Sequence, residues 1–267
     1  MGAMRSEAWI PLVATVISLE FTMALLRRWR ASRRSYLRSW LISFVFFTAG
    51  TAALWYGVAF GWSSPSFRAF YLFGAFLSAP WLAQGELELL APPKFARVTG
   101  VFLALITVNM IFLIGYAPFV DNQTVAGNEL PHGKDLFPVY IRVAVVFANV
   151  VGTVVVVGGT VWSGLRSRGR GPAATSRFRG TMLIALGVLI SAAGGGLTYL
   201  GEANGLAISL VLGVAVMYYG FVVASRRPAA HRAARRRRRD RRNDETVEPG
   251  HLLDRDADDA GAELVRA

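Results

Sequence analysis

The chain has 267 residues, of which 54% are hydrophobic, and its formal net charge is +12. It contains no cysteine, which excludes disulfides, thiolate nucleophiles and Cys-ligated metal or iron–sulfur sites. Its apolar residues lie in blocks of roughly 20, the length that crosses a hydrocarbon core of about 30 Å. We therefore expect an integral membrane protein and not a soluble domain.

The first apolar block, at about 8–26, is followed by its positive charges in the run RRWRASRRSYLR. A signal peptide would carry its charges before the block, so we interpret it as a retained transmembrane helix. Six further blocks must also be helical, because a segment in lipid has to satisfy its own backbone hydrogen bonds. The sequence thus predicts an all-α bundle of seven transmembrane helices, at about 8–26, 40–62, 67–90, 98–119, 139–162, 181–200 and 206–224.

Positive charges alternate along the predicted connections. Arginines are concentrated between helices one and two, between five and six, and after seven, while Lys94 and Arg97 lie between three and four. The opposite side holds only Arg5, Arg68, Lys134 and Arg142. The positive-inside rule then predicts an extracytoplasmic N-terminus and a cytoplasmic C-terminus, which agrees with an odd number of helices.

An internal repeat is also conceivable from the pattern. The run GTAALWYG at 50–57 aligns with GGGLTYLG at 194–201, and each lies in a predicted helix that follows an arginine-rich connection. A parallel three-plus-one-plus-three repeat about the membrane normal would explain the match. The alternative is coincidence, because small and aromatic residues recur in many membrane helices.

Residues 1–225 are predicted to form the membrane domain and 226–267 a cytoplasmic tail. The tail is basic from 226 to 242, with ten arginines and one acid, and mostly acidic afterwards. Such blocks bury too little apolar surface to fold alone, so we expect disorder. The basic half and the cytoplasmic loops favour anionic lipids, and a cytoplasmic protein partner is the alternative. Nucleic acid is disfavoured, because no aromatic residue is interleaved with the arginines.

Polar residues gather in the second half of the third predicted helix. Gln84, Glu86 and Glu88 lie there, and Glu20 lies in the first helix, seven residues before Arg27. A carboxylate at that depth costs about 3 kcal/mol unless it is protonated, paired or hydrated, so such residues often mark function. Gln84 and Glu88 share a helix face at the i, i+4 spacing, and Glu86 points elsewhere.

Two interpretations of these acids remain open. If the third helix turns Glu86 towards Glu20, the two carboxyls form a proton-linked site or a polar head-group pocket open to the cytoplasm. Alternatively, the acids pair with loop arginines such as Arg27 or Arg97 and hold the helix ends in place.

Other residues of these helices also carry two interpretations. Pro80 lacks an N–H, so the carbonyl of Phe76 loses its donor and the helix is expected to kink, with Ser78 able to supply a replacement bond. The kink serves a pocket or only the shape of the bundle. Asn109 and Asn149 lie near mid-membrane, where an amide either contributes to a ligand site or hydrogen-bonds across helices.

The predicted helices lack the residues that several kinds of active site require. No lysine lies in an apolar block, so a retinal Schiff base is impossible, and all three histidines lie in the predicted loop or tail. This removes histidine-based protease, zinc and haem sites from the membrane. The chain has no zinc-protease, P-loop or dinucleotide motif, and we expect no cofactor and no metal.

Three runs carry a resemblance to a known family: FRAFYLFGAFLSAPWLAQGELELL, FANVVGTVVVVGGTVWSGLRSR and RGTMLIALGVLISAAGGGLTYLG. They resemble a family of seven-helix integral membrane proteins from actinobacteria and relatives, over about 38–225. The resemblance implies the seven-helix topology and a bacterial cytoplasmic (inner) membrane location. It implies no activity and assigns a role to no residue.

The sequence leaves three functions open. The first is binding or transport of a small or lipid-like ligand at a polar site in the cytoplasmic half of helices one and three. The second is a sensor or scaffold that recruits a cytoplasmic partner through the charged tail. The third, a lipid-modifying enzyme, is less favoured, because carboxyls without histidine or cysteine provide few catalytic groups.

Overall fold

The structure is a computed structural model that describes residues 8–119, 125, 130–131, 133–167, 172–197 and 203–225. In this described part every regular element is helical and no strand occurs. The chain divides into two units, and the first comprises Met1–Arg170 and Ala174–Ser225. The predicted tail at 226–267 lies outside the described residues.

The first two helices, α1 (Trp9–Ser32) and α2 (Ser35–Phe60), are joined by Arg33 and Arg34 alone. Arg33 adopts the left-handed conformation, with φ 52°, which ends α1 and turns the chain back. The two helices pack along a row of buried hydroxyl groups. Thr22 bridges to Thr48 (3.0 Å between oxygens) and donates to the Phe44 carbonyl at 3.1 Å. Such bonds substitute for hydrophobic attraction between helices in lipid.

The third predicted helix is present as a continuous helical run in three parts. It begins with α3 (Ser64–Ala69), which Ser63 caps in a reciprocal bond pair with Ser66. It continues as the π-helix η2 (Phe70–Leu77) and ends as α4 (Ser78–Leu90). The irregularity therefore precedes Pro80. At η2 the backbone comes very close to α2, because a Cβ on Gly50 would lie 2.4 Å from Gly74 Cα.

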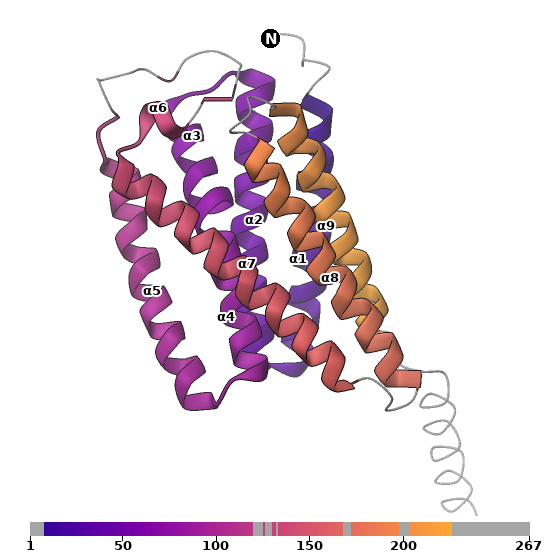
Figure 1. Cartoon of the computed structure of the whole chain (residues 1–267). Helices are drawn as coiled ribbons and strands as arrows, with labels where there is room; N and C mark the ends of the chain where they lie inside the picture. The colour runs from indigo at the N-terminus through magenta and orange to yellow at the C-terminus, as the bar shows by residue number, and fades with distance from the viewer. Residues whose placement is uncertain are drawn as a thin grey trace, which may run out of the picture. The chain divides into compact units, whose positions relative to one another are not determined.

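The remaining elements are α5 (Pro93–Tyr116), the short α6 (Gly133–Leu136), α7 (Val139–Ser167), α8 (Pro172–Leu197) and α9 (Ala203–Ser225). Figure 1 shows α5 at one edge of the bundle and α7 running obliquely between the α5 side and α8. Helices α8 and α9 meet through glycines: a Cβ on Gly187 would lie 2.6 Å from the Gly213 carbonyl oxygen.

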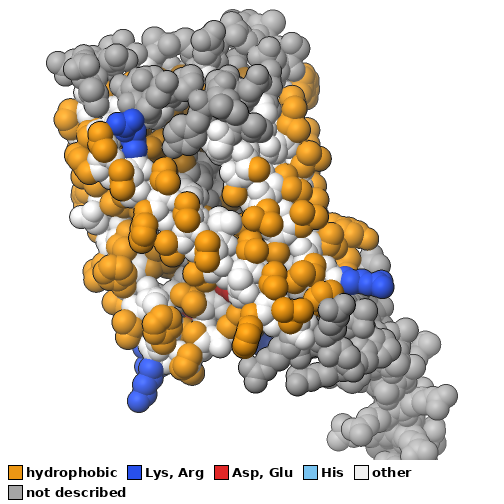
Figure 2. Space-filling model, viewed as in Figure 1, with side chains coloured by type: hydrophobic (Ala, Val, Ile, Leu, Met, Phe, Trp, Pro, Cys, Tyr) orange, Lys and Arg blue, Asp and Glu red, His pale blue; other side chains and the backbone are white. Residues whose placement is uncertain are grey.

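Six of the described helices are long and apolar enough to cross a membrane, namely α1, α2, α5, α7, α8 and α9. They mark the chain as a multi-pass membrane protein. The face in Figure 2 is covered by hydrophobic side chains, and lysine and arginine lie towards its ends. The predicted span at 67–90 is not among the six, because η2 divides it and its longest α-helical part, α4, has 13 residues.

Most helices extend beyond the predicted boundaries. The fourth begins at Pro93 and not at 98, and the sixth begins at Pro172 and not at 181. Hydropathy marks the length of chain within hydrocarbon, whereas a helix continues through polar residues until its backbone is capped. Proline suits both starts, because its fixed φ fits the first helical turn.

Candidate functional site

The polar residues predicted in the third helix lie on α4. This helix buries Ala83, Gln84, Gly85 and Glu86, and the exposed fractions of Gln84 and Glu86 are 2% and 3%. Helix α4 packs between α2 and α7. Its polar groups therefore point into protein and not towards lipid.

Gln84 and Glu88 join three helices by hydrogen bonds. The Gln84 amide donates to the Ala96 carbonyl on α5 at 2.7 Å and to Glu88 Oε1 at 3.4 Å. The same Glu88 oxygen accepts from Ser39 on α2 at 2.8 Å. This confirms that Gln84 and Glu88 share a face. Glu88 Oε2 is buried without a partner. The arrangement holds α2, α4 and α5 together near one end of the bundle.

Glu86 points to α7 and lies in a notch made by Gly159. A Cβ on Gly159 would lie 2.6 Å from Glu86 Cγ and 3.0 Å from its Oε1, so only glycine leaves room for this side chain. Within the described residues Glu86 has no hydrogen-bond partner, and neither it nor Glu88 forms an ion pair. Pairing with loop arginines, the alternative interpretation of these acids, is absent from that part of the chain.

Trp40 packs on the same turn of α4, at the residue before Glu86. A Cβ on Gly85 would lie 2.1 Å from Trp40 Cδ1, so the indole ring packs directly on the α4 backbone. The indole Nε1 is buried without a hydrogen-bond partner. A buried indole N–H normally finds an acceptor, so this donor is free to bind one.

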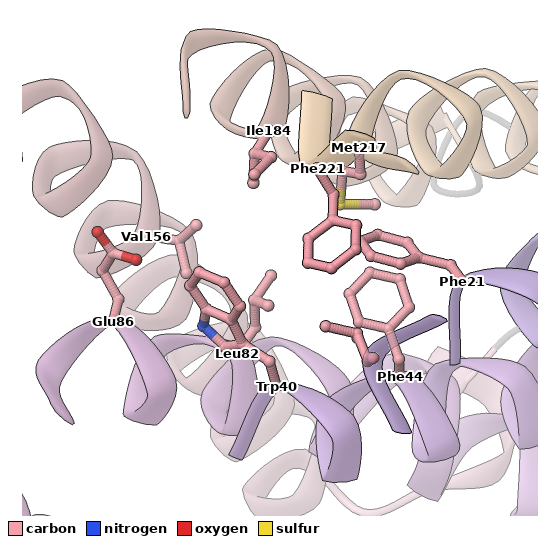
Figure 3. Close-up of a pocket in the computed structure, with 10 residues that line it drawn as sticks. Phe21, Trp40, Phe44, Leu82, Glu86, Val156, Ile184, Met217 and Phe221 are labelled. Carbon is pink, nitrogen blue, oxygen red and sulfur yellow. The ribbon is translucent and has the colours of Figure 1, made fainter. Parts of the chain in front are cut away.

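Glu86 and Trp40 both line a cavity of about 20 Å³, enough for one water molecule. Six helices contribute to its wall. In Figure 3, Phe21, Phe44 and Phe221 cluster beside Met217, and Glu86 lies across the pocket beyond Trp40, Leu82 and Val156. The lining residues are Phe21, Leu25, Trp40, Phe44, Leu82, Glu86, Val156, Ile184, Met217 and Phe221. Glu86 is the only ionisable residue among them.

A larger cavity of about 110 Å³ adjoins the first, and both are lined by Phe44, Leu82 and Met217. Its wall contains five residues with hydroxyl or amide side chains: Ser43, Ser78, Asn149, Thr153 and Ser191. The Ser191 hydroxyl is buried without a partner. This cavity has both the volume and the polar groups to hold several waters or part of a small molecule.

Asn149 lies in the wall of the larger cavity and contacts η2. Its amide donates to the Ala75 carbonyl, and also to Val145 on its own helix at 2.9 Å. The predicted bond across helices is thus confirmed. Ser78 donates to the Gly74 carbonyl at 2.8 Å and not to that of Phe76. The replacement bonds serve the π-helical carbonyls that precede Pro80.

Two predicted site residues do not reach this site. Glu20 is exposed on α1, whose buried face carries Ser18 and Thr22. Asn109 is exposed on α5, two residues after the buried Thr107. Residues two apart in a helix lie on nearly opposite sides, so each polar group points away from the bundle. The interpretation in which Glu86 faces Glu20 is therefore wrong.

The prediction from sequence missed Trp40, Ser39 and Gly159. Nothing in the sequence distinguished Trp40 from the other six tryptophans. The adjacent glycines Gly158 and Gly159 in a valine-rich span could have indicated that another helix comes close at this point. Only Gly159 has such a contact, with Glu86 on α4. Gly158 has nothing within 4 Å.

We compared the chain with family models, curated proteins and solved structures. None of them matches it. What the site could bind is therefore inferred from its geometry.

Proposed function

We propose that this membrane protein binds a small amphiphilic amine inside the helical bundle, with Glu86 as the group that recognises the cationic nitrogen. One observation carries the proposal: a carboxyl that is 3% exposed, without a hydrogen-bond partner in the described residues, borders a cavity. The cavity beside the carboxyl has room for a group the size of a water molecule, such as an ammonium head group.

The carboxyl sets the polarity of the ligand. A buried carboxylate without a partner costs several kcal/mol, so it binds either a proton or a cation. The other nine lining residues offer no positive charge. An ammonium group supplies both the charge and the N–H donors that the carboxyl lacks.

The other residues that line the cavity are apolar, and they determine which groups the rest of the ligand carries. Phe21 packs against Phe44 and Phe221 with ring centroids 4.1 and 5.2 Å apart. These rings, with Leu82 and Met217, favour an alkyl or aryl group. Met217 lines both cavities and has a flexible side chain, so we infer that its rotation lets the ligand extend into the larger one.

The membrane arrangement is part of the same proposal. We infer that the run at 64–90 is a seventh spanning helix, since 27 residues rise about 40 Å, more than a hydrocarbon core. The arginine-rich connections then support a cytoplasmic C-terminus in a bacterial inner membrane, as the family resemblance implies. The three-plus-one-plus-three repeat stays a prediction, because residues 198–201 of the aligned run lie outside the described part.

The test compares hexylamine with hexanol, which has the same chain but a neutral head. Thermal unfolding of the purified full chain in detergent is followed at increasing ligand concentration. We expect a saturable rise in Tm with hexylamine, by mass action, and none with hexanol. Glu86→Gln keeps the size of the side chain but removes its charge, so it should abolish the rise.

The matched control is Glu20→Gln, which makes the same change on the exposed face of α1 and should respond like the wild type. An equal rise in wild type and Glu86→Gln, or no rise in the wild type, would overturn the proposal. In that case the scaffold hypothesis, with the charged tail as the recruiting segment, becomes the better candidate.

A further inference from the structure

Helix α5 is the least enclosed of the six candidate spans. Only 6% of its apolar window is buried, against 22–39% in the other five. It packs on α4 and η2 and lies at the edge of the bundle (Figure 1). The rest of its surface faces outwards, where only lipid or another protein can cover it.

The exposed side of α5 carries a regular seam. Seven exposed residues recur at alternating steps of three and four: Phe95, Val98, Phe102, Leu105, Asn109, Phe112 and Tyr116. Six of them are large and apolar, with exposed fractions from 54% to 82%. This spacing suits a helix that packs along its length against another helix. The adjacent row of Val101, Ala104, Val108 and Ile111 is also exposed at the same spacing, so Asn109 is what distinguishes the seam.

Asn109 is the one polar residue in the seam. In the described part of the chain its amide has no hydrogen bond, whereas the nearby Thr107 accepts one from Trp81 at 3.0 Å. Lipid tails offer neither donors nor acceptors, so an amide at this depth remains unsatisfied unless a second polar group reaches it. The occupant of the seam must therefore present such a group.

We propose that the seam packs against the same seam of a second copy of this chain, with the two Asn109 amides hydrogen-bonded across a two-fold axis. An amide is both donor and acceptor, so it is complementary to itself. Two copies with the same topology place Asn109 at equal depth, and a two-fold axis along the membrane normal makes the α5 helices parallel. One asparagine in an apolar seam is a known way to set the register of a parallel helix pair.

Glu20 on α1 is also exposed, but two Glu20 carboxyls could not pair between two copies as two Asn109 amides can. Two carboxylates at equal depth repel each other, whereas two amides attract. The proposal is independent of ligand binding at Glu86, which lies on α4 and points to α7.

The chain has no cysteine, so single cysteines report contacts between copies without background. Leu105→Cys lies in the seam, one turn from Asn109. Its matched control is Ala104→Cys, an exposed neighbour that lies about 100° around the helix. Under mild oxidation in native membranes, we expect a disulfide-linked dimer from Leu105→Cys and little from Ala104→Cys, because the bond requires Cα atoms within about 7 Å.

Asn109→Leu in the Leu105→Cys background tests the hydrogen bond itself. Loss of one amide pair should weaken dimerisation by about 3- to 20-fold, measured by energy transfer between labelled copies diluted in lipid. Asn109→Gln should retain most of the affinity. Equal cross-linking from positions 104 and 105, a monomer in native membranes, a cross-link to a different protein, or no effect of Asn109→Leu would each overturn the proposal.

Discussion

Asn149 on α7 donates a hydrogen bond to the carbonyl of Ala75, five residues before Pro80. In a π-helix each carbonyl bonds to the N–H five residues later, and Pro80 has none to offer. A side chain 74 positions away in sequence thus supplies the donor that proline removes. The bond connects the irregular helix η2 to α7 beside the larger cavity.

We expect Asn149→Leu to destabilise the protein. The substitution leaves the Ala75 carbonyl without this donor, so the free energy of unfolding should fall by about 1–2 kcal/mol. Unfolding in detergent measures the change. Asn109→Leu, the same substitution on the exposed side of α5, should leave unfolding of the diluted monomer within about 0.5 kcal/mol of the wild type. Equal losses for both variants would contradict a specific role for Asn149.

Gly159 and Gly158 provide a second matched pair. Alanine at 159 would place a methyl group 2.6 Å from Glu86 Cγ and must displace that side chain. We expect a loss of about 1–3 kcal/mol in unfolding free energy from Gly159→Ala, together with weaker hexylamine binding. Gly158→Ala meets open space and should change neither measurement. Normal ligand binding by Gly159→Ala would show that the position of Glu86 does not depend on this notch.

The contact between α2 and η2 should tolerate no side chain at Gly50. Its Cβ would lie 2.4 Å from Gly74 Cα and 2.5 Å from Gly74 N, which are backbone atoms and cannot rotate away. Gly50→Ala should therefore lower the free energy of unfolding by about 2 kcal/mol or more, as measured by thermal unfolding. The control is Gly196→Ala on α8, where no atom lies within 4 Å. A neutral result for Gly50→Ala would mean that the two helices separate easily.

Arg68 is expected to stabilise the end of α5. Its guanidinium donates to the carbonyls of Ile114 and Ala117, the latter at 2.8 Å, and lies 4.1 Å from the ring centre of Phe119. Lysine keeps the charge but lacks the planar fork that bonds both carbonyls. Arg68→Lys should therefore speed hydrogen exchange at the last turn of α5. Arg97→Lys, on an exposed residue near the start of α5, should leave that exchange unchanged.

Local rules predicted part of the site correctly. The i, i+4 spacing placed Gln84 beside Glu88, and their bond at 3.4 Å confirms it. The bond of Asn149 across helices was also expected, because an amide within lipid requires a partner. Its acceptor was not predictable, since it depends on how α7 crosses η2.

The rotation of each helix about its axis was not readable from the sequence. Helix α1 is apolar on most of its circumference, so nothing in its pattern showed that Ser18 and Thr22 face inwards and Glu20 outwards. The same holds for Thr107 and Asn109 on α5. The contact of the Trp40 ring with Gly85 likewise depends on how α2 and α4 pack.

The sequence by itself indicated that the chain enters the membrane and which chemistries lack their residues, and six of its seven predicted spans are helices apolar enough to cross a membrane. Tertiary structure alone decided which polar groups meet: Glu86 at Gly159, Ser39 with Glu88, and neither Glu20 nor Asn109 with any of them. The physical reason is that lipid and protein interior are both apolar. Hydropathy therefore indicates which segments leave water, and only the packing of helices against one another determines which side of each faces the protein.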